Sequence, residues 1–149
     1  MIPDLANAHV LLVEDNDINR FAARDMLVRA GWQVTEARDG REAVELAREF
    51  AFKIILMDVS MPTMDGLEAT RLIRSEGGLS SRVPIIGVTA HALPEEQARL
   101  REAGMQDCLI KPLRLRMVEA LTARFAGPFE DRELPDTGGR LLNAEALRE

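Results

Sequence analysis

The chain has 149 residues, 46% of them hydrophobic and 30% charged, which indicates one soluble domain with a core large enough to fold unaided and excludes a second globular unit. A net charge of −6 and an aromatic content of 4% argue against a nucleic-acid partner, because phosphate backbones attract basic surfaces and bases stack on aromatic rings. The single cysteine excludes an internal disulfide, and no apolar run approaches the roughly 20 residues of a bilayer-spanning helix.

Five short runs rich in aliphatic and β-branched residues alternate with longer segments of helical spacing. The runs are residues 9–13, 33–36, 53–57, 84–88 and 107–110. This alternation predicts a (βα)5 domain of the α/β class, with a doubly wound parallel five-stranded sheet. Helices then cover both faces of the sheet, so its middle strands can be apolar throughout.

The first two predicted helices follow the first two strands. The first helix ends at Gly31, because glycine readily adopts the left-handed conformation that stops a helix. Asp39 caps the second helix, with Glu42 three places further on. The buried faces are predicted to be Ile18, Phe21, Ala22 and Val28 in the first helix, and Ala43, Val44, Ala47 and Phe50 in the second.

Three more helices are predicted after the third, fourth and fifth strands. The third helix ends near Gly77, and the fourth begins at Pro94, since proline fits the first turn of a helix. The apolar faces comprise Ala69, Leu72 and Ile73 in the third helix, and Met117, Val118, Leu121 and Phe125 in the last. We therefore assign residues 1–126 to one domain, with its core at about 8–125.

Residues 127–149 are predicted to be an acidic linker or tail. Proline and glycine residues break any continuing helix there, and the segment holds six acids against three arginines. Within it, Leu141, Leu142, Ala146 and Leu147 suggest one short helix.

Reactive side chains stand where four of the predicted strands end. Asp58 closes the third strand, whereas Glu14 and Asp15 follow the first, Thr89 the fourth and Lys111 the fifth. The carboxyl ends of parallel strands share one edge of the sheet, where ligands bind, so these groups are expected to meet in one cleft.

Three carboxylates in a small space repel one another unless a cation lies between them. Mg²⁺ prefers oxygen ligands and needs no histidine or cysteine. A carboxylate beside such an ion can attack phosphorus, which predicts Asp58 as the nucleophile, with Lys111 and Thr89 contacting the phosphoryl oxygens. Each group also has an ordinary interpretation on its own, as a surface cap, a solvated turn, a structural hydroxyl or a surface charge.

Four motifs resemble the receiver domain of two-component response regulators. They are VLLVEDN at 10–16, LMDVSMPTMDG at 56–66, VTA at 88–90 and KP at 111–112, and the resemblance spans about residues 8–125. It implies the flavodoxin-like fold with strand order 2-1-3-4-5 and a cis Lys111–Pro112 bond. It also implies Mg²⁺ or Mn²⁺ held by Asp15, Asp58 and the main-chain carbonyl of Ser60, with Glu14 acting through a water.

The same resemblance implies a function in a phosphorelay. Asp58 would accept a phosphoryl group from a phosphohistidine of a histidine kinase or phosphotransfer domain. The chain would be a signalling protein that promotes its own phosphorylation and dephosphorylation, and not an enzyme in the ordinary sense. A cytoplasmic location is expected because residues 1–8 do not have the pattern of a secretory signal. Residues 13–20 and 89–92 resemble receivers of hybrid histidine kinases, so other domains of one larger kinase are alternative partners.

The chain departs from the family at Cys108, where many receivers have tyrosine or phenylalanine. Either the output then depends on the loop that begins at Ala90 or on the backbone of the fifth strand, or Cys108 simply fills the core. Ser60 and His91 flank the approach of a hydrolytic water in the family, although His91 is also explicable as an exposed loop residue. Two rival functions are a haloacid-dehalogenase-type phosphatase using Asp15 and a docking module that never carries phosphate.

Overall fold

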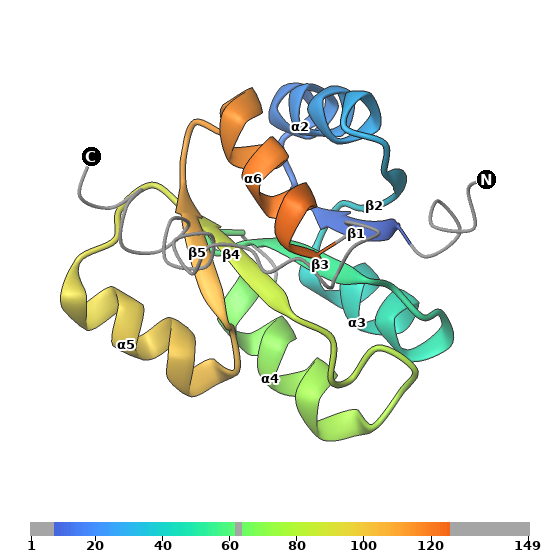
Figure 1. Cartoon of the computed structure of the whole chain (residues 1–149). Coiled ribbons are helices and arrows are strands. Elements are labelled where there is room, and N and C mark those ends of the chain that lie inside the picture. Colours follow the sequence, from blue (N-terminus) through green and yellow to red (C-terminus); the bar gives the residue numbers. More distant parts are fainter. Residues whose placement is uncertain (1–7, 62–63, 126–149) are drawn as a thin grey trace.

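The computed structural model describes residues 8–61 and 64–125, where five strands alternate with five helices (Figure 1). The strands are β1 (His9–Val13), β2 (Gln33–Ala37), β3 (Ile54–Asp58), β4 (Ile85–Thr89) and β5 (Asp107–Ile110). The helices are α2 (Asp17–Arg29), α3 (Gly40–Glu49), α4 (Gly66–Glu76), α5 (Pro94–Ala103) and α6 (Leu115–Phe125). The prediction of a (βα)5 domain is confirmed.

All five strands are parallel, and they lie in the order β2-β1-β3-β4-β5. Helices α2 and α6 cover one face of the sheet, and α3, α4 and α5 cover the other (Figure 1). The doubly wound flavodoxin-like fold is therefore confirmed, including the strand order. Asp58 is the last residue of β3, as predicted, whereas Thr89 is the last residue of β4 and does not follow it.

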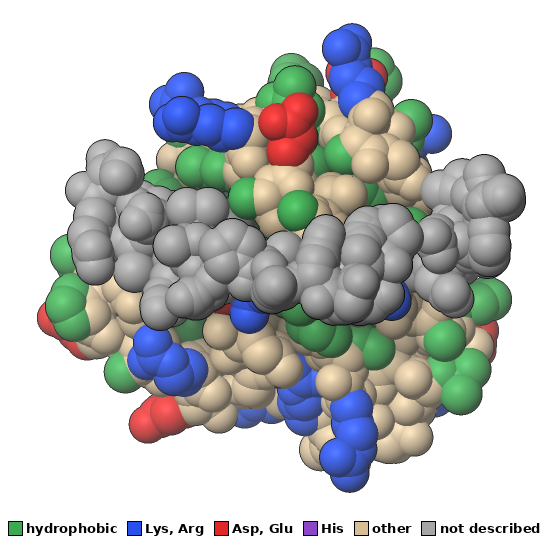
Figure 2. All heavy atoms as spheres, viewed as in Figure 1, with side chains coloured by type: hydrophobic (Ala, Val, Ile, Leu, Met, Phe, Trp, Pro, Cys, Tyr) green, Lys and Arg blue, Asp and Glu red, His purple; other side chains and the backbone are tan. Residues whose placement is uncertain are grey.

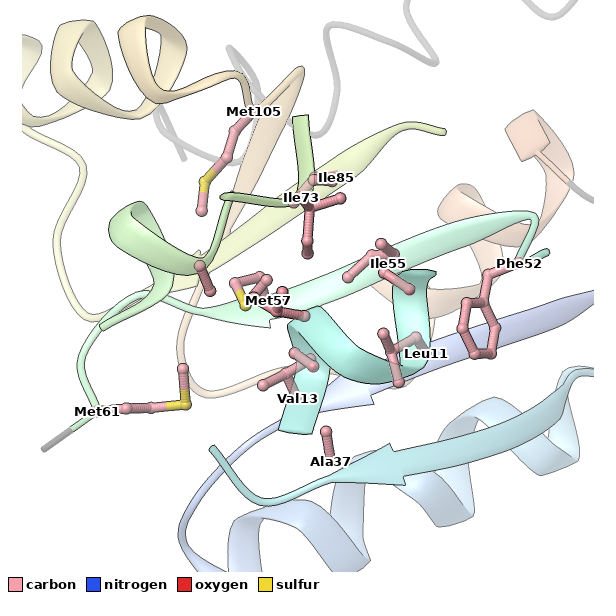
Figure 3. Close-up of a cluster of buried hydrophobic side chains, with 14 of the residues drawn as sticks. Leu11, Val13, Ala37, Phe52, Ile55, Met57, Met61, Ile73, Ile85 and Met105 are labelled. Atoms are coloured by element: carbon pink, nitrogen blue, oxygen red, sulfur yellow. The ribbon is translucent and has the colours of Figure 1, made fainter. Parts of the chain in front are cut away.

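Alternation along the strands builds two cores, because successive strand side chains point to opposite faces of a sheet. Leu11 and Ile55 face α3, α4 and α5, as Figure 3 shows, whereas Leu12 and Leu56 face α2 and α6. These central-strand residues are fully or almost fully buried on both sides, as expected for a sheet covered by helices on both faces.

The predicted helix boundaries at Asp39, Pro94, Gly31 and Gly77 are confirmed. Asp39 accepts a hydrogen bond from the amide of Glu42, and Pro94 is the first residue of α5. Gly31 and Gly77 have φ of 102° and 72°, a conformation that side chains other than glycine rarely adopt.

The predicted buried face of the first helix is wrong. Ile18 and Phe21 are 78% and 70% exposed, and Ala22 and Val28 are also exposed. The face that meets the sheet is Arg20, Ala23 and Leu27, with spacings of three and four residues. A charged residue is tolerated on this face because the Arg20 guanidinium is paired with Asp17 and Glu36.

Phe50 is a smaller correction of the same kind. It caps the C-terminus of α3 with extended backbone and a largely exposed side chain, so it does not continue the buried stripe of Ala43, Val44 and Ala47. In the last helix, Val118 and Leu121 are buried and Met117 and Phe125 pack against them, as predicted.

The assignment of residues 127–149, with its short helix, falls outside the described residues and stays a prediction. Among the described helices, none has both the length and the apolar content needed to cross a membrane. On the face shown in Figure 2, the described Lys and Arg side chains are interspersed with apolar and uncharged ones.

Candidate functional site

The residue around which the site is built is Asp58, at the carboxyl end of the central strand β3. Its side chain is 2% exposed. Oδ1 accepts hydrogen bonds from Lys111 Nζ at 3.0 Å and from the Ser60 amide at 3.1 Å. Oδ2 is also buried, and it has no hydrogen-bond partner in the described part of the chain. The carboxylate therefore has one satisfied oxygen and one without a hydrogen-bond donor among the described residues.

Glu14 lies beside this carboxylate, directly after β1. Its Oε1 is 3.9 Å from Lys111 Nζ, and its Oε2 accepts a hydrogen bond from the Asn16 amide at 3.1 Å. Burial raises the pKa of Glu14 to about 7, and the negative charge of Asp58 adds to that effect, whereas Asn16 and Lys111 oppose it. Burial and the charge of Asp58 thus both disfavour the ionised form of Glu14.

The three acids of the site can share one cation. Glu14, Asp15 and Asp58 each offer a carboxylate oxygen, and these three atoms lie within 4.8 Å of one another. A set made only of oxygen atoms suits a hard divalent ion such as Mg²⁺. The unpaired and buried Asp58 Oδ2 is the independent observation that favours a cation here. The residues present therefore fit a divalent metal.

Thr89 lies at the same sheet edge, and its hydroxyl is hydrogen-bonded within its own loop. Its hydroxyl donates to the His91 carbonyl at 2.8 Å and accepts from the His91 amide at 3.3 Å. Ala90 and His91 are exposed in the loop that follows β4. The structure thus brings Glu14, Asp58 and Lys111 into contact, while the threonine hydroxyl is held by its own loop.

Two further predicted site residues, Cys108 and Lys111, lie in β5 and directly after it. The Lys111–Pro112 peptide bond is cis, as the sequence resemblance implies. Cys108 is buried in the core beneath α5, and burial raises the pKa of its thiol to about 11. A neutral, buried thiol of this kind fills space, which favours the simpler of the two interpretations of Cys108.

Sequence reasoning missed two residues that shape the site. Asn16 caps α2 by accepting from the Asn19 amide, and its own amide donates to Glu14. Arg20 is 7% exposed and donates to the main-chain carbonyl of Glu14 at 3.0 Å. The sequence signal for Asn16 was that asparagine is a preferred N-cap residue at the position before a helix. The signal for Arg20 was the spacing that it shares with Ala23 and Leu27.

A cavity of about 340 Å³ adjoins the site between α2 and the segment after β5. Its wall is mainly apolar, but Glu14 and Lys111 of the site also line it. Lining residues include Val13, Glu14, Ala22, Met26, Lys111 and Leu113.

The sequence of residues 10–123 matches the family model of the response regulator receiver domain. This chain belongs to the receiver family. It is a receiver domain of two-component signalling, homologous to the receivers of hybrid sensor histidine kinases. The phosphatase alternative from the sequence is therefore set aside, because residues 10–123 match the receiver family.

Two relatives among sensor kinases illustrate the homology. Sensor histidine kinase RcsC of Salmonella typhimurium is 41% identical over 117 residues, which are 78% of this chain and 12% of RcsC. The chain thus spans a small part of that relative. The crystallised receiver domain of sensor histidine kinase PA1611 from Pseudomonas aeruginosa PAO1 is 39% identical, with a TM-score of 0.74 over 81% of this chain and 98% of that one. That structure has a magnesium ion coordinated in the active site cleft.

A second similar structure is a complex. It is the co-crystal structure of the Saccharomyces cerevisiae histidine phosphotransfer signaling protein Ypd1 and the receiver domain of its downstream response regulator Ssk1. The matched chain is 27% identical, with a TM-score of 0.72 over 80% of this receiver and 89% of that chain.

Proposed function

We propose that this receiver accepts a phosphoryl group on Asp58 from a phosphohistidine, in a Mg²⁺-dependent step of a phosphorelay. The single observation that carries the proposal is the Asp58 carboxylate itself. It is buried, it contacts the Lys111 ammonium at 3.0 Å, and its second oxygen is unpaired among the described residues. A carboxylate in this setting is a nucleophile with its charge-neutralising partner already in place.

The transfer needs few groups, because phosphoryl transfer depends mainly on positioning and on neutralising charge. A carboxylate oxygen of Asp58 forms the new bond to phosphorus, while the bond from phosphorus to the donor histidine nitrogen breaks and its electron pair stays on the imidazole. Lys111 offsets negative charge on the phosphoryl oxygens. Thr89 would exchange the His91 carbonyl for a phosphoryl oxygen as its hydrogen-bond acceptor.

We assign the metal site to Asp15, Asp58 and the main-chain carbonyl of Ser60, with Glu14 acting through a water. A bound Mg²⁺, or Mn²⁺ in its place, supplies positive charge to the crowded carboxylates and to the incoming phosphoryl group. The spacing of the three carboxylates and the magnesium-bound PA1611 receiver support this assignment.

The chain then acts as a signalling phosphoacceptor that promotes its own phosphorylation and dephosphorylation, and not as an enzyme with a separate substrate. The exposed Ser60 and His91, two residues beyond Asp58 and Thr89, flank the approach of the water that removes the phosphoryl group. When the Thr89 hydroxyl gives up its hydrogen bond to the His91 carbonyl, the loop from Ala90 would be released.

We propose a histidine kinase or histidine phosphotransfer domain as the partner, and its docking surface as the start of α2. Ile18 and Phe21 are exposed there, beside the apolar cavity that reaches Glu14 and Lys111. A donor domain that covered these side chains would exclude water from the site and bring its histidine to Asp58. The complex of Ypd1 with the Ssk1 receiver supports this class of partner.

The test is to incubate the chain with a small acyl phosphate donor and Mg²⁺ and to measure its intact mass. Wild type is expected to gain one phosphoryl group, and Asp58→Asn is expected to gain none. The matched control is Asp25→Asn, which removes an exposed carboxylate on α2 and is expected to behave as wild type. Phosphorylation of Asp58→Asn, or none of wild type, would refute the proposal.

A further inference from the structure

We propose that Arg20 is a positioning residue for the metal-binding acids, an inference that rests on the proposed function. Arg20 stands on the buried face of α2 and is 7% exposed. Its guanidinium donates in three directions, to Glu14, Asp17 and Glu36. Through the first of these contacts it acts on the turn that carries the acidic pair.

The contact with Glu14 involves the main chain. Arg20 Nη1 donates to the carbonyl oxygen of Glu14 at 3.0 Å, and the amide of Glu14 donates to the Ala37 carbonyl at 3.1 Å. The Glu14 carbonyl and the Asp15 amide belong to one planar peptide group. Holding that carbonyl therefore sets the direction in which the chain leaves β1 and places Asp15 beside Asp58.

The guanidinium is itself anchored to two other elements. Its Nε donates to Glu36 of β2 at 3.0 Å, and its Nη2 donates to Asp17 of α2 at 2.6 Å. The planar fork of an arginine can make such contacts together, whereas a lysine ammonium is a single point charge on a flexible stem. The acidic turn is thus tied through one side chain to a strand and a helix.

The choice of arginine is informative at this position. Ala23 and Leu27 occupy the same buried face of α2, so an apolar residue would fit the pattern without the expense of taking a charge out of water. Arg24 also forms an ion pair with Glu36, at 3.0 Å, but it is half-exposed and makes no hydrogen bond to the acidic turn among the described residues. The contact with the Glu14 carbonyl is what separates Arg20 from its neighbour.

The experiment compares Mg²⁺ affinity, measured by calorimetry, in wild type, Arg20→Met and Arg24→Met. Both variants remove a guanidinium from Glu36, but only the first releases the Glu14 carbonyl. We expect Arg20→Met to weaken Mg²⁺ binding about tenfold or more, as is usual for partners that orient metal ligands, and Arg24→Met to leave it unchanged. Arg20→Lys should restore little of the Mg²⁺ affinity, because a lysine ammonium cannot make the three contacts of the planar guanidinium together. Thermal unfolding without metal checks that each variant is folded.

The outcomes separate this proposal from the proposed function. If wild type binds no Mg²⁺, the proposed function fails. If wild type binds but a folded Arg20→Met binds equally well, or if Arg24→Met loses as much affinity, only the positioning role is overturned. Should Arg20→Met not fold, Glu36→Gln is the variant to measure. It removes the charge that anchors the Arg20 guanidinium, while glutamine keeps the size of the glutamate side chain. If Glu36→Gln binds Mg²⁺ more weakly than Arg24→Met does, the positioning role of Arg20 is supported. If the two variants bind Mg²⁺ equally well, that role is rejected.

Discussion

The two oxygens of Asp58 have unlike surroundings, and the difference bears on how the residue reacts. Oδ1 accepts from an ammonium and an amide, while Oδ2 is buried without a partner among the described residues. Buried polar atoms are nearly always paired, because an unpaired one loses its hydration without compensation. Next to Asp58, burial raises the pKa of Glu14 to about 7, and the negative charge of Asp58 adds to that effect. Lys111 is the one described cation within 4 Å of both acids.

The first prediction concerns Lys111→Met, which keeps the aliphatic stem and removes the ammonium. The rate of phosphoryl transfer from a small acyl phosphate to Asp58 should fall by about a hundredfold, since a preorganised donor to the developing charge is lost. Mg²⁺ affinity should not fall, because the ammonium competes with the ion for the same carboxylates. Intact-mass kinetics and calorimetry measure the two effects.

Lys53→Met is the matched control, because Lys53 is the other lysine of the chain and is exposed immediately before β3. It should leave both quantities unchanged. A folded Lys111→Met variant with the transfer rate of wild type would show that the ammonium plays no part in the reaction.

The second prediction is a pH effect at Asp107, which lies away from the site. Burial raises the pKa of Asp107 from 3.8 to about 6, although the Cys108 amide and Arg124 oppose this shift. A folded state that binds the proton more tightly than the unfolded state loses stability as pH rises. The free energy of unfolding of wild type minus that of Asp107→Asn should therefore decrease between pH 3.8 and about 6 and level off above.

Urea unfolding of both proteins across that pH range measures the difference. The contributions of the other acids to the free energy of unfolding are the same in both proteins, so they cancel. A difference that rises with pH would mean that the ion pair with Arg124, at 3.2 Å, outweighs burial.

Among the elements, α2 separates what a sequence pattern can predict from what it cannot. Apolar residues alone pointed to the wrong face, because Ile18, Phe21 and Val28 are exposed and an arginine is buried. The correct stripe appears once Arg20 is allowed inside, but nothing in the local sequence shows that Asp17 and the distant Glu36 will pair with it. In α3, Ala43, Val44 and Ala47 follow an apolar stripe with no buried charge, and the prediction succeeded there except at Phe50.

The third prediction tests the exposed start of α2 as a docking surface. Phe21→Ser should change the free energy of unfolding by no more than about 0.5 kcal/mol, because the ring is 70% exposed. It should slow transfer from a phosphorylated histidine phosphotransfer domain by about tenfold, since a buried aromatic anchor is lost from the complex. Transfer from a small acyl phosphate should be unaffected.

Leu79→Ser is the control, since Leu79 is 66% exposed but lies beyond α4, in the connection to β4. It should leave transfer from both donors unchanged. Equal rates with the protein donor for Phe21→Ser and wild type would place the docking surface elsewhere.

At the scale of the whole molecule, the strand order explains why distant residues meet. The chain crosses from β1 outward to β2 and then back past β1 to β3, so the ends of β1 and β3 lie next to each other at the point where the winding reverses. Ligands bind at such points in open parallel sheets. Strand patterns predicted that Glu14, Asp58 and Lys111 share an edge, but the order 2-1-3-4-5 came only from the family resemblance. Neither predicted the Thr89 hydroxyl bond to His91, which depends on the conformation of a loop.

The last prediction follows from placing three acids at this edge. A ligand that binds only the folded state stabilises it by mass action, and at a concentration of 100 times its dissociation constant the gain is about 2.7 kcal/mol. Mg²⁺ should therefore raise the unfolding temperature of wild type, and a chelator should reverse the increase. Asp58→Asn should respond much less, because it removes a carboxylate from the site, whereas Asp25→Asn should respond fully. Calorimetric unfolding over a Mg²⁺ series measures this, and Na⁺ at equal ionic strength controls for screening of the net charge of −6. Stabilisation of Asp58→Asn equal to that of wild type would mean that the ion binds away from the sheet edge, and the crowded acids would then need another explanation.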